Sequence, residues 1–421
     1  MDNSKYFKAT RALLIGVFSL FMVSCQNPKR DKTDLGISLK KDVTFLASDE
    51  LEGREIGTKG EQKAAVYIVD RFKTIGLKPA GTDNYFQKFE VTPAQNPHEQ
   101  AKVGHGGDSL TITGNNVMGM IDNPGDQIIV IGAHYDHLGY GGVSSLYRGD
   151  SLVHNGADDN ASGVGVLLQL AELLKEQKLQ KDILFLAFSG EEEGLWGSNY
   201  FTKNPTVDLG KVSAMINMDM VGKLDEQKAL AIHGTGTSPS WERIINDSNT
   251  DSINLMFRPS GVGPSDHTSF YLQDIPVLHF FTGQHEDYHR PSDDAEKLNY
   301  DGMVKISMMI ERIVKALDSA EKLAFTKTKD ESSDTPRFKV TLGVVPDYLF
   351  GGKGMRIDGL TEGKPASEAG LKKGDVVVQL GDFAIEDMNT YMQALSKFEK
   401  GSQTTVKVKR GDEELSYSIN F

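Results

Sequence analysis

Three mostly hydrophobic runs in the middle of the chain each end where an acidic or histidine-bearing segment begins. The runs cover residues 128–131, 183–188 and 212–216. Short apolar runs of this kind are typical of strands that are buried on both faces of a parallel sheet. Because open α/β sheets form their sites beyond the carboxyl ends of such strands, we expect the polar segments to meet at one edge of a sheet.

Helical patterns alternate with these runs. Residues 60–75 place their apolar side chains on one stripe that stops at Gly76, and residues 160–178 give the clearest amphipathic helix. The alternation predicts an α/β fold, a three-layer α/β/α sandwich with a mostly parallel central sheet. Further elements are expected as strands at 229–232 and 276–281 and helices at 241–246 and 301–323.

Two stretches depart from this alternation. Residues 92–126 are rich in Pro, Gly and Asn, which predicts loops with a short strand at 110–113. Residues 327–336, KTKDESSDTP, have the composition of a linker. Beyond the linker the pattern predicts a small β-rich domain, with strands at 340–345, 355–357, 376–380 and 405–408 and a helix at 389–398.

The first 24 residues have the pattern of a secretion signal. Three basic residues precede an apolar run at 12–23, which is too short to span a bilayer. The run ends at Cys25, and the segment resembles the lipobox of bacterial lipoproteins, except that Met22 stands where leucine is usual. Cys25 would then be lipidated, and residues 25–37 would tether the protein to the membrane.

The predicted location is therefore the bacterial cell envelope, with a lipid-anchored protein that faces the periplasm or the cell surface. A plain secreted protein that is cleaved elsewhere is the alternative. Cys25 is the only cysteine, so the fold needs no disulfide. The formal charge of −13 and the pI of about 5.3 argue against a nucleic-acid partner, since phosphate binding requires a basic surface.

Five short segments concentrate the candidate chemistry. Imidazole and carboxylate groups are zinc ligands, and a two-zinc hydrolytic site needs a bridging carboxylate, terminal ligands for each ion and a separate carboxylate to move protons. Five short segments of this chain can supply five metal ligands and one carboxylate base. They are AHYD at 133–136, ADDN at 157–160, SGEEEG at 189–194, NMDM at 217–220 and YHRPSD at 288–293.

The phrases AHYDHLG, NGADDNASG, SGEEEGLWGS, NMDMVG and YHRPSDD, in this order, resemble the M28 family of metallopeptidases, which includes co-catalytic zinc aminopeptidases. The resemblance covers residues 38–325 and implies two zinc ions per chain. It implies that His134 and Asp219 hold one zinc, that Glu192 and His289 hold the other, and that Asp158 bridges them. Glu191 would be the general base.

The same resemblance implies supporting roles. Asp136 would orient His134, as metal-bound imidazoles usually require, and Asp293 could serve His289 similarly. The bond Asp158–Asp159 is the candidate for a cis peptide.

Around the substrate cleft, Asp266 and His267 match a family segment and are expected as pocket residues. His137 would contact the metal ligands without binding a metal ion itself. The remaining histidines match no ligand pattern, namely His98, His105, His154, His233, His279 and His285.

The phrase PASEAGLKKGD at 365–375 closely resembles the PDZ domain, and this resemblance covers residues 337–421. PDZ domains bind an extended peptide beside an exposed strand and hold its terminal carboxylate with backbone N–H groups. Leu342, Gly343 and Val344 match the position of that carboxylate loop, which implies a C-terminal peptide ligand. The alternative is a domain that packs on the catalytic domain and binds nothing.

Together these features imply a zinc-dependent exopeptidase, in the first place an aminopeptidase, acting on peptide substrates. A glutaminyl cyclase-like transferase of the same fold, a carboxypeptidase, and a PDZ-centred binding protein with a vestigial peptidase domain are the alternatives. The GADDN and EEEGLWGS phrases resemble the peptidase branch, and no ligand or base is lost. The expected order is a signal peptide at 1–24, a tether at 25–37, the peptidase domain at 38–325, a linker at 326–336 and the PDZ domain at 337–421.

Overall fold

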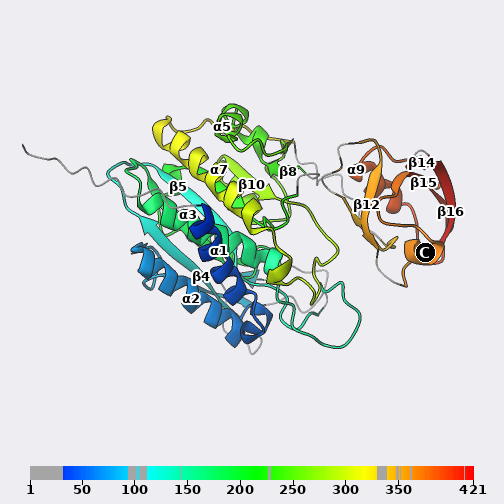
Figure 1. Ribbon diagram of the computed structural model, residues 1–421, viewed down its shortest axis with the longest axis horizontal. Coiled ribbons are helices and arrows are strands. Elements are labelled where there is room, and N and C mark those ends of the chain that lie inside the picture. The colour runs from blue at the N-terminus through cyan, green and yellow to red at the C-terminus, as the bar shows by residue number, and fades with distance from the viewer. Residues whose placement is uncertain are drawn as a thin grey trace, which may run out of the picture. The chain divides into compact units, whose positions relative to one another are not determined.

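A computed structural model describes most of the chain (Figure 1). The described residues are 32–92, 102–103, 111–142, 144–225, 229–329, 339–347, 350, 352–360, 363–411 and 413–421. The predicted signal peptide, Cys25, and most of the predicted tether and linker lie outside them, as do His98 and His105. Within the described residues, no helix is both long enough and apolar enough to cross a membrane.

A ten-stranded mixed sheet forms the centre of the larger domain. Its order is β3-β2-β4-β6-β5-β7-β10-β8-β9, with β1 paired to β4. The four strands β6, β5, β7 and β10 run parallel to one another, which confirms the parallel centre of the sheet. The strands are β1 (Lys78–Pro79), β2 (Phe86–Thr92), β3 (Lys102–Val103), β4 (Ile112–Ile121), β5 (Ile128–His134), β6 (Asp182–Phe188), β7 (Val212–Met218), β8 (Leu230–His233), β9 (Leu255–Arg258) and β10 (Val277–Phe281).

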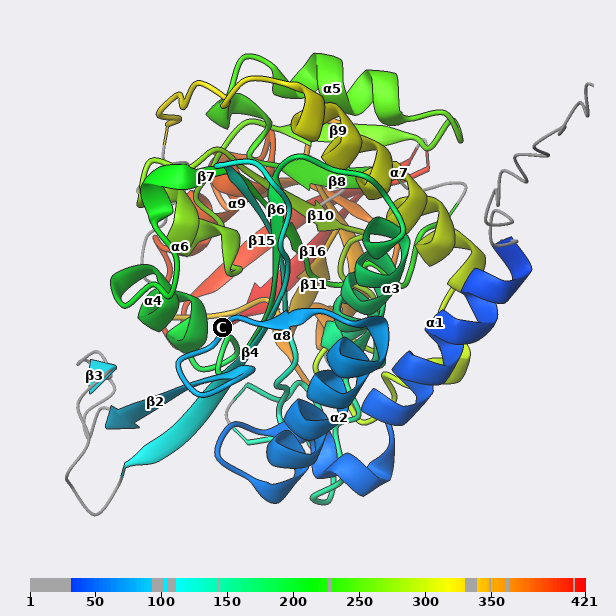
Figure 2. The same ribbon diagram turned by 90° about the vertical axis from the view of Figure 1, so that its left-hand side faces the viewer.

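Helices cover both faces of this sheet, as Figure 2 shows, and complete the predicted three layers. Helices α1, α2, α3 and α7 pack together on one face, and α4 and α6 lie on the other. Their bounds are α1 (Lys32–Leu46), α2 (Lys59–Ile75), α3 (Gly163–Lys175), α4 (Trp196–Lys203), α5 (Trp241–Ser248), α6 (His267–Tyr271) and α7 (Tyr300–Ser319). Short 3₁₀ or π turns occur at Asp49–Arg54, Ala157–Ser162, Leu209–Lys211, Thr235–Thr237 and Ala295–Lys297.

Strand β5 is continuously apolar in sequence because both of its faces are buried. Ile129 and Ile131 join the core under α1, α2, α3 and α7, whereas Ile128 and Val130 join the core on the opposite face. Successive side chains of a strand point to opposite faces, so a strand covered on both faces needs an apolar residue at every position.

Two expectations about the larger domain were wrong. Strand β4 is ten residues long and pairs with β2 and β6, although residues 92–126 were expected to be mainly loop. Its Gly and Asn residues concealed it, because Asn116 is buried and bonds Gln87 and Gly197. Helix α1 begins at Lys32, so the last residues assigned to the tether are helical and Leu35 is buried.

The C-terminal domain has its own antiparallel sheet, ordered β11-β12-β13-β15-β16 with β14 on β13. Its core is separate and includes Leu342, Ile357, Val377 and Val406. The elements are β11 (Val344–Pro346), β12 (Met355–Leu360), α8 (Pro365–Ala369), β13 (Val376–Leu380), β14 (Phe383–Ala384), α9 (Met388–Leu395), β15 (Gln403–Arg410) and β16 (Glu413–Asn420).

The proposed carboxylate loop enters this sheet at its edge. Leu342 points into the core, Gly343 has a left-handed φ of 72°, and Val344 opens β11. Among the described residues β11 pairs only with β12, so its other edge has no strand partner.

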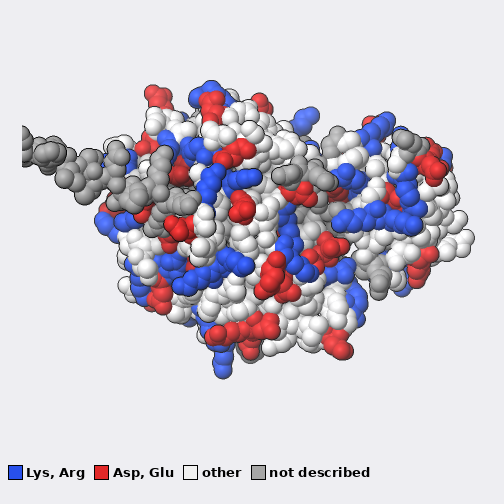
Figure 3. All heavy atoms as spheres, viewed as in Figure 1, with Lys and Arg blue, Asp and Glu red and all other residues white. Residues whose placement is uncertain are grey.

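Charged side chains of both signs are interspersed over the face of the larger domain in Figure 3. Of the acidic groups that matter for the candidate chemistry, Asp136 and Asp159 are buried inside the domain, and Glu191, Glu192 and Asp219 are only slightly exposed.

Candidate metal centre

The ends of neighbouring strands bring the candidate residues together. His134 is the last residue of β5, Asp219 directly follows β7, and Glu191 and Glu192 follow β6 after a short turn. His289 comes from the loop after β10. Because β6, β5, β7 and β10 are parallel, their carboxyl ends meet at one edge, where the sequence placed the site.

One aspartate carboxylate is shared between two groups of side chains. Asp159 Oδ1 lies 3.4 Å from His134 Nε2, and Asp159 Oδ2 lies 3.2 Å from His289 Nε2. Asp219 Oδ1 completes the first group at 3.3 Å from His134 Nε2. Glu192 Oε2 completes the second at 3.2 Å from His289 Nε2.

The shared position therefore belongs to Asp159 and not to Asp158, which was expected to bridge. Asp158 points the other way: its Oδ1 accepts the Gly222 N–H at 2.6 Å, and its Oδ2 lies 3.0 Å from His285 Nε2. Adjacent side chains on a turning backbone diverge, so only one of the two aspartates can face the site. The cis peptide bond is likewise one residue later than expected, at Asp159–Asn160.

His137 lies closer to the second group than the sequence suggested. Its Nδ1 is 2.7 Å from Glu192 Oε1 and 4.0 Å from Asp159 Oδ2. His134, Asp159 and Asp219 form one cluster that could hold a metal ion, and His137, Asp159 and Glu192 form another. The signal for His137 was its place in the phrase AHYDHLG.

Asp136 connects the His134 segment to the glutamate turn. Its carboxylate accepts the backbone N–H groups of Glu191 at 3.1 Å and Glu192 at 3.3 Å, and its Oδ1 lies 3.6 Å from His134 Nδ1. Asp136 is buried, so these contacts fix the orientation of the glutamates as well as that of the imidazole.

Glu191 lies beside the clusters without belonging to either. Its nearest imidazole contact is His134 Nε2, at 3.8 Å. Burial, with the neighbouring carboxylates of Asp219 and Glu192, raises the pKa of Glu191 well above its usual range. A carboxyl group with a raised pKa can hold and release a proton near neutral pH.

Asp293 does not contact His289, contrary to the expectation. Its Oδ2 accepts the backbone N–H groups of Asp158 at 2.9 Å and Asp159 at 3.1 Å, so it holds the turn that presents Asp159. His289 Nδ1 instead lies 2.9 Å from the carbonyl oxygen of Ser144, which fixes that ring.

Arg54 is a further residue whose role sequence reasoning missed. Its fully buried guanidinium donates to the carbonyls of Tyr135 at 2.8 Å, Asn155 at 2.7 Å and Gly156 at 3.0 Å, and also to Leu46. It thereby joins the segment after His134 to the loop before Asp159.

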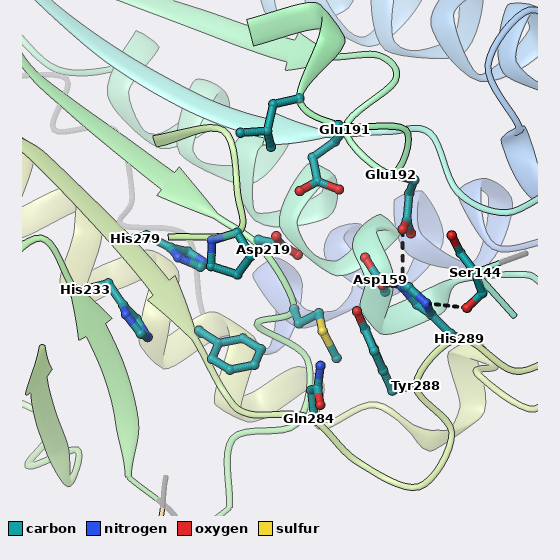
Figure 4. A pocket seen from close by; sticks show the side chains of 15 residues that line it. Ser144, Asp159, Glu191, Glu192, Asp219, His233, His279, Gln284, Tyr288 and His289 are labelled. Carbon is teal, nitrogen blue, oxygen red and sulfur yellow. Dashed lines mark hydrogen bonds and ion pairs between the residues drawn. The ribbon is translucent and has the colours of Figure 1, made fainter. Parts of the chain in front are cut away.

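A pocket of about 540 Å³ opens beside the clusters (Figure 4). Figure 4 shows Glu192, Asp159 and His289 at one end, His233 and His279 at the other, and Asp219 and Glu191 between them. Asp266 and His267 were expected in this pocket but do not line it. His267 lies behind its wall, with its ring centroid 4.5 Å from that of His279, and Asp266 is fully buried.

The acidic end is suited to divalent cations. The Glu191 and Asp219 carboxylates outweigh burial and raise the pKa of His134 well above its usual value. In the same way Glu192 and Asp159 raise the pKa of His289 to about 11. These imidazoles and carboxylates form the mixed N/O donor set that zinc accepts, with Asp159 able to offer one oxygen to each of two ions.

The two domains match known families. Residues 116–314 match peptidase family M28, and residues 326–421 match the PDZ domain. Aminopeptidase YwaD of Bacillus subtilis is 29% identical over 183 residues, which are 41% of this chain and 37% of that protein. The uncharacterized protein YfbL of Escherichia coli is 29% identical over 220 residues, or 45% and 65% of the two chains. This chain thus spans less than two thirds of the length of either relative.

Solved structures share the fold of the larger domain. BSAP, a zinc aminopeptidase from Bacillus subtilis, superposes with a TM-score of 0.53 at 17% identity, covering 70% of this chain and 99% of that one. Porphyromonas gingivalis glutaminyl cyclase gives a TM-score of 0.52 at 18% identity, covering 67% and 98%. At these identities the likeness shows the fold alone, which an aminopeptidase and a cyclase therefore share.

Proposed function

This chain carries an M28-family peptidase domain followed by a C-terminal PDZ domain, and from this premise we propose that it is a two-zinc aminopeptidase. The observation that carries the proposal is the Asp159 carboxylate, whose two oxygens face His134 on one side and His289 on the other. Asp219 with His134 would hold one zinc, and Glu192 with His289 the other.

The residues of the chain divide the chemistry among them. Bound zinc would polarise the scissile carbonyl and lower the pKa of water. Glu191, which lines the pocket beside the clusters, would take a proton from the attacking water and deliver it to the departing amine. Asp136 would keep Glu191 and Glu192 in position through their backbone N–H groups.

Two histidines, His137 and His289, lie close enough to Glu192 to share a zinc ion with it. His137 Nδ1 lies 2.7 Å from Glu192 Oε1 but 4.0 Å from Asp159 Oδ2, whereas His289 Nε2 lies 3.2 Å from both Glu192 Oε2 and Asp159 Oδ2. We therefore propose His289 as the ligand and His137 as the residue that orients Glu192.

The test is a metal analysis combined with a panel of peptides. We expect two zinc ions per chain and hydrolysis of peptides with a free N-terminus but not of their N-acetylated forms. Conversion of N-terminal Gln to pyroglutamate on the intact peptide, with release of ammonia and without cleavage of any peptide bond, would mean that the chain is a cyclase. Cleavage of N-acetylated peptides from their C-terminus would mean a carboxypeptidase.

For the C-terminal domain we propose capture of a peptide by its C-terminus. The free edge of β11 and the adjoining loop at Leu342, Gly343 and Val344 support this, because such domains add an extended peptide to an exposed strand. The captured end is opposite to the end that an aminopeptidase cuts, so the domain would recruit long substrates or a partner.

We also propose that the enzyme is anchored to the cell envelope by a lipid on Cys25, a proposal supported by the sequence pattern alone. In the cell of origin, Cys25→Ala should release the protein from the membrane fraction and leave its specific activity intact. A variant that stays membrane-bound after a salt wash would contradict the lipid anchor.

A further inference from the structure

Glu61 is a buried acid that joins two of the segments that carry the site. It lies in the first turn of α2 and is fully buried. Its Oε1 lies 2.7 Å from the hydroxyl of Tyr135 and 2.8 Å from that of Ser189. Tyr135 directly follows His134, and Ser189 begins the turn that carries Glu191.

The hydrogens of this cluster can be counted. The Tyr135 hydroxyl lies 2.7 Å from Glu61 Oε1 and also 2.7 Å from the carbonyl oxygen of Asn115. A phenol has one O–H to donate, and a carbonyl can only accept. If Tyr135 donates to Asn115, then the proton between Tyr135 and Glu61 must come from Glu61.

The remaining contacts of Glu61 agree with this arrangement. Ser189 can donate its hydroxyl to Oε1, and the Gly57 N–H donates to Oε2 at 3.3 Å. A protonated Oε1 therefore donates to Tyr135 and accepts from Ser189, and every polar group has one partner. An ionised Glu61 would leave Tyr135 one proton for two acceptors.

The electrostatic surroundings favour the protonated acid. Burial, helped by the negative charge of Asp136, raises the pKa of Glu61 to about 7, although the hydrogen bonds from Tyr135, Ser189 and Gly57 oppose the shift. Among the described residues, the groups that shift the pKa of Glu61 most are two hydroxyls, one N–H and a carboxylate, and none of these is a cation. Burial, with Glu61 beside it, raises the pKa of Tyr135 well above its usual value, so the phenol keeps its proton.

We propose that the folded enzyme holds Glu61 as a neutral carboxylic acid and that this acid is a positioning residue for His134 and Glu191. Through Tyr135 and Ser189, the protonated side chain links the end of β5 to the end of β6. Its consequence for catalysis rests on the proposed peptidase function, but its protonation state does not.

Infrared difference spectroscopy tests the protonation directly. At about pH 6, where an ordinary glutamate is ionised, the wild type should show the carbonyl stretch of a buried carboxylic acid that Glu61→Gln lacks. Absence of that band in the wild type would overturn the proposal.

The pH dependence of stability gives a second test. The unfolded chain ionises Glu61 near its ordinary pKa, while the folded chain keeps the proton until about pH 7. The melting temperature of the wild type should therefore fall relative to that of Glu61→Gln between about pH 4.5 and pH 7 and run parallel above it. Parallel curves over the whole range would contradict a neutral Glu61.

Kinetics test the positioning. Glu61→Met keeps the volume but removes the hydrogen bonds, and it should lower kcat on the order of tenfold or more with little change in KM. Glu61→Gln, which keeps a neutral hydrogen-bonding group, should stay within a few-fold of the wild type. Tyr135→Phe is a milder variant that should lower kcat less, in case Glu61→Met does not fold.

Gln169→Met is the matched control, because Gln169 is a buried polar residue that bonds Leu35 and Ser307 away from the site. It should lower the melting temperature without lowering kcat. Unchanged kcat in both Glu61→Met and Tyr135→Phe, or equal losses in Glu61→Met and Glu61→Gln, would overturn the positioning role. A wild type without peptidase activity would instead refute the proposed function, and the infrared and stability results would still decide the state of Glu61.

Discussion

Histidines at the acidic end of the pocket and behind its far wall have opposite properties. At the acidic end, Glu192 and Asp159 raise the pKa of His289 to about 11. Behind the far wall, burial and the nearby His233 lower the pKa of His267 to about 3. The rings of His267 and His279 have no hydrogen-bond partner at any of their nitrogen atoms.

The difference follows from what surrounds each ring. An imidazole among carboxylates keeps its proton, and a bound metal cation can take the place of that proton, whereas an imidazole among other rings stays neutral. The two ends are therefore suited to different parts of a substrate. The acidic end is suited to the metals and the scissile bond, and the wall of His233, His279 and Phe281 is suited to an uncharged side chain.

The largest expected effect separates the two adjacent aspartates. Asp159→Asn should remove the shared carboxylate, lower the zinc content and abolish hydrolysis more completely than any other single change at the site. Asp158→Asn should retain both zinc ions, since Asp158 bonds Gly222 and His285 instead. Metal analysis and rates for both variants decide the matter, and the reverse pattern would restore Asp158 as the bridge.

Removing the proposed base should have the next largest effect. Glu191→Gln keeps the shape of the side chain but cannot transfer a proton, so kcat should fall on the order of 10²–10⁴-fold with the zinc content unchanged. Glu192→Gln should lower the zinc content instead. If Glu191→Gln loses zinc and Glu192→Gln keeps it, the roles of the two glutamates are exchanged.

Metal binding should release protons at the acidic end. In the metal-free protein the neighbouring carboxylates raise the pKa of His134 well above its usual value and that of His289 to about 11, but zinc binds only the neutral ring. Zinc affinity should therefore rise with pH through the range from 6 to 8 rather than level off near the ordinary histidine pKa of about 6.5. Calorimetry in two buffers of different ionisation enthalpy measures the released protons, and a heat independent of the buffer would contradict the prediction.

A change at the far end should alter selectivity and leave the metals in place. His279→Leu removes unpartnered ring nitrogens from the pocket wall, so the ratio of kcat/KM for aliphatic over hydrogen-bonding N-terminal residues should rise by roughly tenfold. A panel of aminoacyl substrates with parallel zinc analysis measures both properties. An unchanged ratio would show that this wall does not contact the substrate side chain.

The smallest expected effect lies outside the pocket. Deletion of residues 337–421 should leave the hydrolysis of dipeptide-sized substrates nearly unchanged but raise KM for longer peptides with a suitable free C-terminus. Equal losses on both kinds of substrate would mean that the PDZ domain supports the catalytic domain and recruits nothing.

Much of the fold followed from hydrophobic periodicity. The runs that became β5, β6 and β7 and the stripe of α2 were predicted because burial on two faces or on one stripe leaves a pattern in the sequence. Strand β4 was missed because buried Asn116 is satisfied by partners distant along the chain, Gln87 and Gly197. Helix α1 was not predicted at all, and its first residues were assigned to the polar tether.

The sequence by itself determined which segments carry the site, since the strand ends and the acidic phrases can be read along the chain. The tertiary structure alone decided which atoms meet. Asp158 and Asp159 have the same side chain at neighbouring positions, and only the turn held by Asp293 directs Asp159 toward both clusters. In the same way, Glu61 contacts Tyr135 and Ser189, which lie 74 and 128 positions away from it along the chain. Spacing along a chain does not specify such contacts, because the direction of each side chain is set by backbone geometry and by packing against distant elements.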